Sequence, residues 1–223
     1  MDITRHTRSL TVAAILAFGV LLSACGDDNN SVGSSAGGDK TTVGNGTDRA
    51  FVADMIPHHE SAVEMAEIAE KRGQSAFVTE LAGDIISSQK SEITKMKAIA
   101  AQLDSAGVKA KSLGVPEHEM GMDMDMNELK TAKPFDRAFI DMMVPHHQGA
   151  IRMARVELAK GQSKDAMTLA KQIIAAQTRE INAMNKHRTA EFGGPSPAGG
   201  VPAADAKNDD SADDGMSSGM DHP

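Results

Sequence analysis

One sequence pattern occurs twice in this chain, and its second copy lies 88 residues after the first. Residues 51–59 read FVADMIPHH, and residues 139–147 read FIDMMVPHH. The same offset relates residues 62–96 to residues 150–184 without a gap. An internal repeat of this kind indicates one structural unit that is used twice. The chain must therefore fold into two similar halves.

The repeated segments carry the apolar spacing of amphipathic helices. With successive residues placed 100° apart, Phe51, Met55 and Ala62 fall on one side of a helix, and glutamates such as Glu60 fall on the opposite side. This pattern predicts helices over about 47–73, 75–103, 134–160 and 163–190, with Gly73 and Gly161 in short turns. Thr47 or Asp48 is the expected N-cap of the first helix. Each repeat is thus a helical hairpin.

Two hairpins predict an all-α fold, because each hairpin alone leaves its apolar stripe exposed to water. We expect a four-helix bundle domain over residues 47–190. Repeat 1 covers about 47–104, a Met-rich connection about 105–133, and repeat 2 about 134–190. The last segment, 191–223, is rich in Gly, Pro, Ala and Asp, and this composition predicts a disordered tail.

The first residues have the features of a bacterial export signal. Arg5 and Arg8 precede an apolar stretch from Leu10 to Leu22, and small residues then lead to Cys25, the single cysteine of the chain. This arrangement predicts a lipoprotein signal peptide over residues 1–24 and a lipidated Cys25 that anchors the protein to a bacterial membrane. Residues 25–46 are polar and predict a flexible spacer. The folded domain should therefore work outside the cytoplasm.

The composition excludes several classes of function. The formal net charge is −8 and the chain has no Trp or Tyr, which argues against nucleic acid as a partner. The sequence also has no nucleophile elbow, phosphate-binding loop, dinucleotide fingerprint or HExxH zinc-protease motif. No motif in the sequence indicates a particular protein partner.

Polar residues occupy the apolar faces of the predicted helices. His58 and His59 straddle the stripe of the first helix, and Glu92 lies in the middle of the stripe of the second. The second repeat has His146, His147 and Glu180 in the same places. A carboxylate on a buried stripe costs desolvation energy unless it meets a cation. The cation is either a protonated histidine, in a structural bridge between helices, or a metal ion.

Imidazole, carboxylate and thioether groups together suit copper best, with zinc, iron and manganese as further candidates. Four methionines on the same stripes could supply thioethers to the histidine and glutamate layer: Met55, Met96, Met143 and Met184. Four others alternate with Gly and Asp in the polar connection, where core packing does not explain them: Met120, Met122, Met124 and Met126. Because thioethers are soft ligands, this second group predicts a separate Cu(I) site.

The two repeated motifs resemble the domain-of-unknown-function 305 (DUF305) family. That family combines M-[IV]-x-H-H-x-x-A-[IV]-x-M-A with I-x-x-x-Q-x-x-E-I-x-x-M, and here these stretches are residues 55–66 with 85–96, and 143–154 with 173–184. The resemblance covers about 47–190. It implies an exported, ferritin-like helical bundle and, for some members, copper binding. It implies no established catalytic activity.

These observations favour a membrane-anchored extracytoplasmic protein that sequesters or buffers copper. One alternative is a di-metal redox enzyme in the bundle core, which would need an open coordination position and a substrate cavity. The other is a metal-free structural or interaction bundle, in which His–Glu bridges fix the register of the helices.

Overall fold

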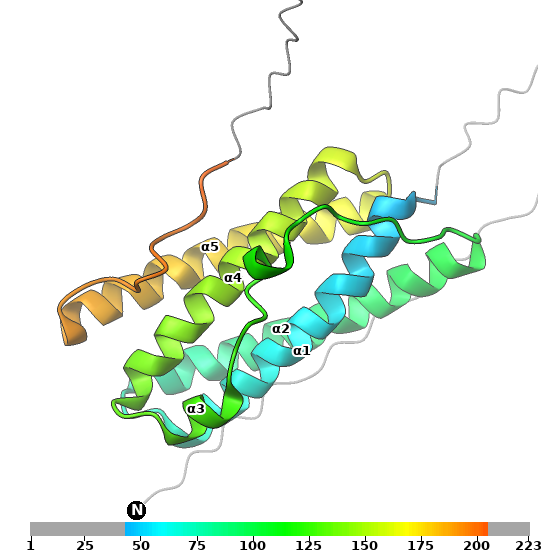
Figure 1. The fold of residues 1–223 in the computed structure, drawn as a ribbon. Coiled ribbons are helices and arrows are strands. Elements are labelled where there is room, and N and C mark those ends of the chain that lie inside the picture. Colours follow the sequence, from blue (N-terminus) through cyan, green and yellow to red (C-terminus); the bar gives the residue numbers. More distant parts are fainter. Residues whose placement is uncertain (1–42, 205–223) are drawn as a thin grey trace, which may run out of the picture. The chain divides into compact units, whose positions relative to one another are not determined.

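The computed structural model describes residues 43–204. The signal peptide, Cys25 and most of the spacer predicted from the sequence lie outside this part of the chain. Four long helices dominate the described residues (Figure 1). They are α1 (Gly46–Arg72), α2 (Ala76–Ser105), α4 (Phe135–Lys160) and α5 (Lys164–Phe192). The connection holds a 3₁₀ turn, η1 (Glu117–Glu119), and a short helix, α3 (Met126–Thr131).

The helices pair as the repeat predicts. Helix α1 packs mainly against α2, α4 packs mainly against α5, and the two hairpins meet chiefly along α1 and α4. The described residues contain no strand, and the predicted all-α fold of two hairpins is confirmed. Helices α1 and α4 continue through Pro57 and Pro145. None of the helices in residues 43–204 is both long and apolar enough to cross a membrane.

The core consists of two apolar clusters, and each draws on both hairpins. One cluster includes Phe51 and Met96 of the first repeat and Met153 of the second. The other joins Met65 of the first repeat to Phe139 of the second. Burial of each large apolar side chain contributes roughly 1.5–3 kcal/mol. Since both clusters are shared, the hairpins stabilise one another rather than folding around separate cores.

Helix α1 begins one residue earlier than predicted, and its N-cap is Asn45 rather than Thr47 or Asp48. The Asn45 side chain accepts hydrogen bonds from the backbone N–H groups of Thr47 and Asp48. Asp48 returns the contact by accepting from the Asn45 N–H. This capping box satisfies donors at the helix start that have no partner within the helix.

A pair of aspartates ties each hairpin to the turn of the other. Asp48 on α1 accepts from the backbone N–H groups of Gln162 and Ser163, in the turn between α4 and α5. Its repeat equivalent, Asp136 on α4, accepts from the N–H groups in the turn between α1 and α2, namely those of Gln74 and Ser75. The repeated Gly-Gln-Ser segments are therefore binding partners for the opposite hairpin.

The connection lies on the bundle, although the sequence predicts an exposed linker. Met120, Met124 and Met126 are partly buried against the two core clusters, and Met122 alone of the four is exposed. Gly149 of α4 permits this close approach, since a Cβ there would lie 1.8 Å from the Met120 carbonyl oxygen. Met alternating with Gly and Asp has the two-residue period of a strand, but the segment forms no strand, so the sequence pattern does not reveal this packing.

Residues 193–204 also differ from the prediction, which places a disordered tail from residue 191. Helix α5 runs to Phe192, and the following segment folds back onto α4 and α5. Its backbone carbonyls accept hydrogen bonds from the side chains of Gln148, Arg155, Asn185 and Arg188. Because these contacts use backbone oxygens, the side-chain composition of the segment does not predict them. Residues 205–223 lie outside the described part.

Candidate metal centre

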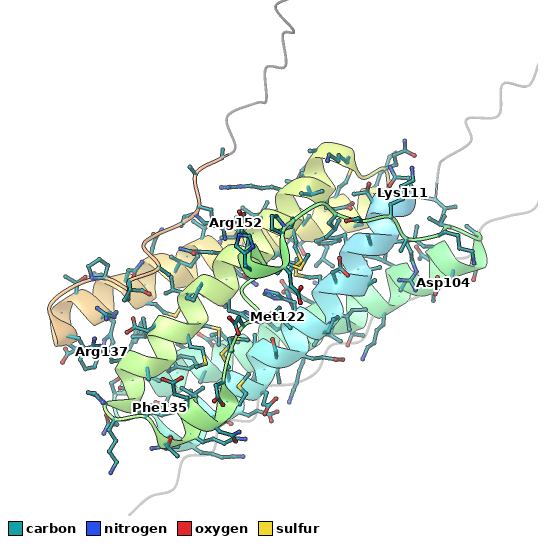
Figure 2. The ribbon with its side chains drawn as sticks, viewed as in Figure 1. Asp104, Lys111, Met122, Phe135, Arg137 and Arg152 are labelled. Atoms are coloured by element: carbon teal, nitrogen blue, oxygen red, sulfur yellow. The ribbon has the colours of Figure 1, made fainter. Side chains whose placement is uncertain are left out.

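The four histidines come together where α1 meets α4. His58, His59, His146 and His147 are almost completely buried. The rings of His58 and His146, which are repeat equivalents, face one another with centroids 3.8 Å apart and an interplanar angle of 34°. Met122, which is labelled in Figure 2, contacts Ser61, and Ser61 in turn contacts His146. The repeat therefore places equivalent imidazoles against each other at the junction of the hairpins.

The outer imidazole of each pair contacts a glutamate within its own hairpin. His59 Nε2 lies 2.8 Å from Glu92 Oε2, and His147 Nε2 lies 2.6 Å from Glu180 Oε2. Glu92 is buried and Glu180 is partly buried. The predicted meeting of histidine and glutamate on the apolar faces is thus present in both hairpins.

The inner imidazoles have different partners in the two halves. His58 Nε2 donates to the Met120 backbone carbonyl at 2.9 Å. His146 Nε2 instead lies 2.8 Å from the Ser61 hydroxyl oxygen. The repeat equivalent of Ser61 is Gly149, over which the Met120 carbonyl passes. The two halves of the site are therefore alike in their His–Glu pairs and unlike at their inner histidines.

The hydrogen-bond partners determine which ring nitrogen can bind a metal. Carbonyl and carboxylate oxygens only accept, so Nε2 carries the proton in neutral His58, His59 and His147. The lone pair of each ring is then on Nδ1. In all four histidines Nδ1 is buried and has no hydrogen-bond partner. Metal-binding histidines almost always donate their other ring N–H to a carboxylate or carbonyl, as His58, His59 and His147 do.

The glutamates contact the imidazoles, whereas the sequence predicts that they contact the metal ion. The sequence suggested Glu92 and Glu180 as metal ligands together with the four histidines. In the structure each carboxylate holds the Nε2–H of an imidazole. That contact orients the ring and makes the nitrogen on its other side more basic.

Burial keeps the inner histidines neutral. Loss of solvation, followed by the neighbouring imidazole of His59, lowers the pKa of His58 to about 3. Burial and then the His58 ring likewise hold the pKa of His146 well below its usual value. Since a metal binds the neutral imidazole, these rings need not release a proton to bind an ion at neutral pH.

The thioethers predicted from the helical stripes are divided between the two core clusters. Met55 and Met96 belong to one cluster, and Met143 and Met184 belong to the other. All four are fully buried, and Met55 and Met143 lie one helical turn before the histidine pairs. Within residues 43–204, no three His, Asp or Glu side chains converge on a point that could hold an ion.

Three further polar residues belong to this layer and are absent from the predicted set. Gln89 and Gln177 are buried, and neither the oxygen nor the nitrogen of their amides has a hydrogen-bond partner. The repeat does retain this glutamine, three residues before each glutamate, and that signal could have identified it. Ser61 differs between the repeats, so no pattern in the sequence marks it.

Comparison with known proteins places this arrangement in a family. The DUF305 family model matches residues 48–188, which include both hairpins and the connection. The chain belongs to the DUF305 family. No curated protein has a sequence that matches the chain significantly.

Several solved structures share the helical fold. CopM in the Cu(I)-bound form is 33% identical, with a TM-score of 0.56, over 65% of this chain and 97% of CopM. The Cu(II)-bound form of CopM is 32% identical with the same TM-score and the same coverage. A DUF305 fragment from Deinococcus radiodurans is 31% identical, with a TM-score of 0.53, over 63% of this chain and 94% of the fragment. CopM has also been solved with silver bound.

Proposed function

We propose that this DUF305 protein binds copper outside the cytoplasm, where it sequesters or buffers the ion while anchored to a membrane through Cys25. The observation that carries the proposal is the set of four buried imidazoles with unpartnered Nδ1 atoms. Three of them are fixed through Nε2 by a carboxylate or a carbonyl. A carboxylate or carbonyl that accepts from the ring nitrogen opposite the metal is typical of metal-binding histidines.

The donor types favour copper over other ions. Imidazole nitrogens suit copper in both oxidation states, and buried thioethers suit Cu(I). CopM, which shares the fold, binds Cu(I), Cu(II) and silver. Zinc, iron and manganese would use the imidazoles but gain little from a core that is rich in methionine.

The proposal assigns different roles to the predicted ligands. The Nδ1 atoms of His58, His59, His146 and His147 would contact the ion. Glu92 and Glu180 would hold the outer rings in place, and the buried methionines Met55, Met96, Met143 and Met184 would supply thioethers when copper is reduced. Because no three His, Asp or Glu side chains of the described residues converge on one point, binding requires the imidazoles as well as the flexible methionine side chains to move.

Two multiple variants test which residues bind the ion. In one, all four histidines are changed to Gln; in the other, Met120, Met122, Met124 and Met126 are changed to Leu. Competition titrations should show that Cu(II) affinity falls mainly in the histidine variant, and that the methionine variant loses the Cu(I) capacity of the separate site predicted in the connection. If the histidine variant binds both ions as wild type does, the repeated His–Glu bridges are structural and the proposal is wrong.

The membrane anchor has its own test. Wild-type protein should fractionate with membranes after a high-salt wash, because lipid chains on Cys25 insert into the bilayer. Cys25→Ser protein should be released into the soluble fraction of the exported material. Membrane retention of the Cys25→Ser protein would contradict the proposed lipidation and would leave the copper site unaffected.

A further inference from the structure

The two halves of the histidine site differ in the group that contacts the inner histidine. On one side, the Met120 carbonyl covers His58, and this is possible because Gly149 has no side chain there. On the other side, the repeat equivalent of Gly149 is Ser61, and its hydroxyl contacts His146. A backbone carbonyl within a packed segment is a fixed partner, whereas a hydroxyl can rotate away. Only on the His146 side of this pseudo-symmetric site, therefore, can the group that contacts the inner histidine be exchanged for another ligand. We call this the exchangeable side.

Met122 extends this exchangeable side to the solvent. Its sulfur lies 3.6 Å from Ser61 Oγ, which in turn lies 2.8 Å from His146 Nε2. The hydroxyl also donates to the His58 carbonyl at 2.8 Å. The Met122 side chain is 38% exposed. A thioether at the surface and a buried imidazole thus contact the same hydroxyl oxygen from two directions.

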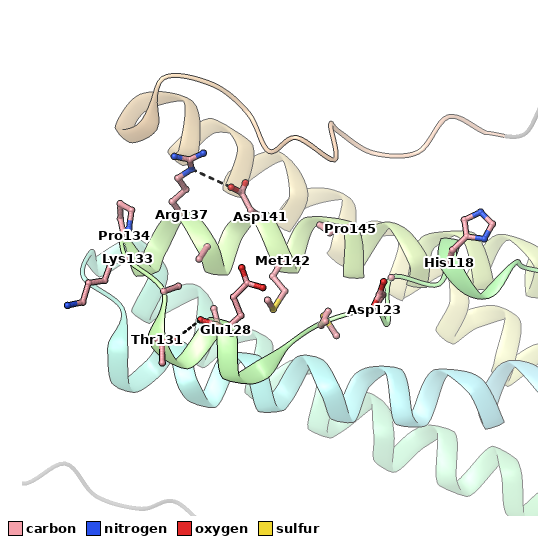
Figure 3. Close-up of a pocket in the computed structure, with 15 residues that line it drawn as sticks. His118, Asp123, Glu128, Thr131, Lys133, Pro134, Arg137, Asp141, Met142 and Pro145 are labelled. Carbon is pink, nitrogen blue, oxygen red and sulfur yellow. Dashed lines mark hydrogen bonds and ion pairs between the residues drawn. The ribbon is translucent and has the colours of Figure 1, made fainter.

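A cavity adjoins this point. It has a volume of about 630 Å³ and lies between the connection and α4 (Figure 3). Its lining includes Gly121 and Asp123, the residues on either side of Met122. Figure 3 shows Met142 and Glu128 projecting into the space between the two segments. Solvent therefore reaches the connection on both sides of the Met122 position.

We propose that Met122 Sδ and His146 Nε2 form an outer site for a soft monovalent ion, Cu(I) or Ag(I), which replaces the Ser61 hydroxyl between them. From this site the ion passes to the buried histidines. This inference rests on the copper-binding function proposed above and names the route by which the ion reaches it. Met122 is flexible, and its thioether can close on an ion that His146 already holds.

The chemistry of the hydroxyl explains why His146 has this role. His58, His59 and His147 have partners that only accept, so their Nε2 atoms keep a proton and cannot bind a metal in the neutral ring. The Ser61 hydroxyl can instead donate its proton either to the His58 carbonyl or to His146. The neutral His146 ring can therefore place its lone pair on Nε2 or Nδ1. Among these four histidines, His146 alone can bind an ion first on its outer and then on its inner nitrogen.

The test measures the rate and the affinity of Ag(I) binding separately, because Ag(I) undergoes no redox change. Stopped-flow mixing of the metal-free protein with Ag(I) should show that Met122→Leu lowers the association rate about tenfold, equivalent to roughly 1.4 kcal/mol in the barrier. The Ag(I) stoichiometry of the inner site should remain unchanged. Ser61→Ala should not lower the rate, since it removes the group that competes with the ion.

Met142→Leu is the matched control, because Met142 lines the same cavity but packs against the core. Its association rate should stay within about twofold of wild type. Equal rates for Met122→Leu and wild type, or equal losses in both methionine variants, would overturn the outer site. Absence of Ag(I) and Cu(I) binding to wild type would instead overturn the proposed function.

Discussion

At the scale of single residues, Gly149 allows the connection to cover the histidines. We predict that Gly149→Ala destabilises the protein by about 1–3 kcal/mol, because the new methyl group must displace the backbone at Met120. Denaturant melts measure this change, and proteolysis should cut the connection faster than in wild type. Gly83→Ala is the control: it is helical and has nothing within 4 Å of its added Cβ. That variant should gain about 0.5–1 kcal/mol from helix propensity, and a loss in both variants would contradict the prediction.

Glu92 supports a second prediction at this scale. Its carboxylate is mostly buried and contacts the fully buried His59. Removing one member of such a pair leaves the other without its partner, so Glu92→Ala should lose about 3–5 kcal/mol of stability without metal. Glu92→Gln keeps the volume and a hydrogen-bonding oxygen, and it should lose clearly less. Circular-dichroism melts of both variants that coincide with wild type would show that this contact contributes nothing to stability.

At the scale of elements, the reciprocal aspartates link the start of one hairpin to the turn of the other. Asp136→Ala removes two charge-assisted hydrogen bonds, and we expect it to lose about 1.5–3 kcal/mol. Asp48→Ala should lose more, because Asp48 also serves the capping box of α1. Urea melts at neutral pH give both values. If Asp136→Ala and Asp48→Ala lose the same free energy of unfolding, the loss comes from the contact between the hairpins alone, and the capping box contributes nothing.

The helices could be predicted from the sequence because each carries an apolar period of its own. The meeting of histidine and glutamate could be predicted for the same reason, since Glu92 and His59 lie on apolar faces that have to pack. The partners of the inner histidines His58 and His146 could not, because they depend on Ser61, which the other repeat replaces with Gly149. The packing of the connection and of residues 193–204 rests on backbone oxygens and on a missing side chain at Gly149. Neither leaves a periodic pattern in the sequence.

At the scale of the whole molecule, two sets of buried groups make stability depend on pH in opposite ways. Burial, and then the neighbouring Asp48, raise the pKa of Glu157 from 4.5 to about 9. The folded state therefore keeps a proton that the unfolded state releases, and stability falls as pH rises from 4.5 towards 9. The pKa of His58 is lowered from 6.5 to about 3, so the unfolded state gains a proton first, and stability falls as pH decreases from 6.5 towards 3. His146 and Asp48, whose pKa values are also lowered, act in the same direction as His58.

Between pH 4.5 and 6.5 the two effects oppose each other, but two histidines outweigh one carboxyl, so we predict that the metal-free protein is most stable near pH 6.5. Above pH 6.5 the Glu157 carboxyl determines how stability changes with pH, because it must ionise beside the Asp48 carboxylate. Glu157→Gln keeps a neutral group at this position, so it should flatten the alkaline side of the profile and leave the profile below pH 4.5 unchanged. Exposed Glu60 provides the control, since Glu60→Gln should follow wild type throughout. Denaturant melts from acidic to alkaline pH measure the profile. Wild-type stability that increases steadily from pH 6.5 to 9 would show that Glu157 is ionised at neutral pH and that its proton does not stabilise the junction of the hairpins.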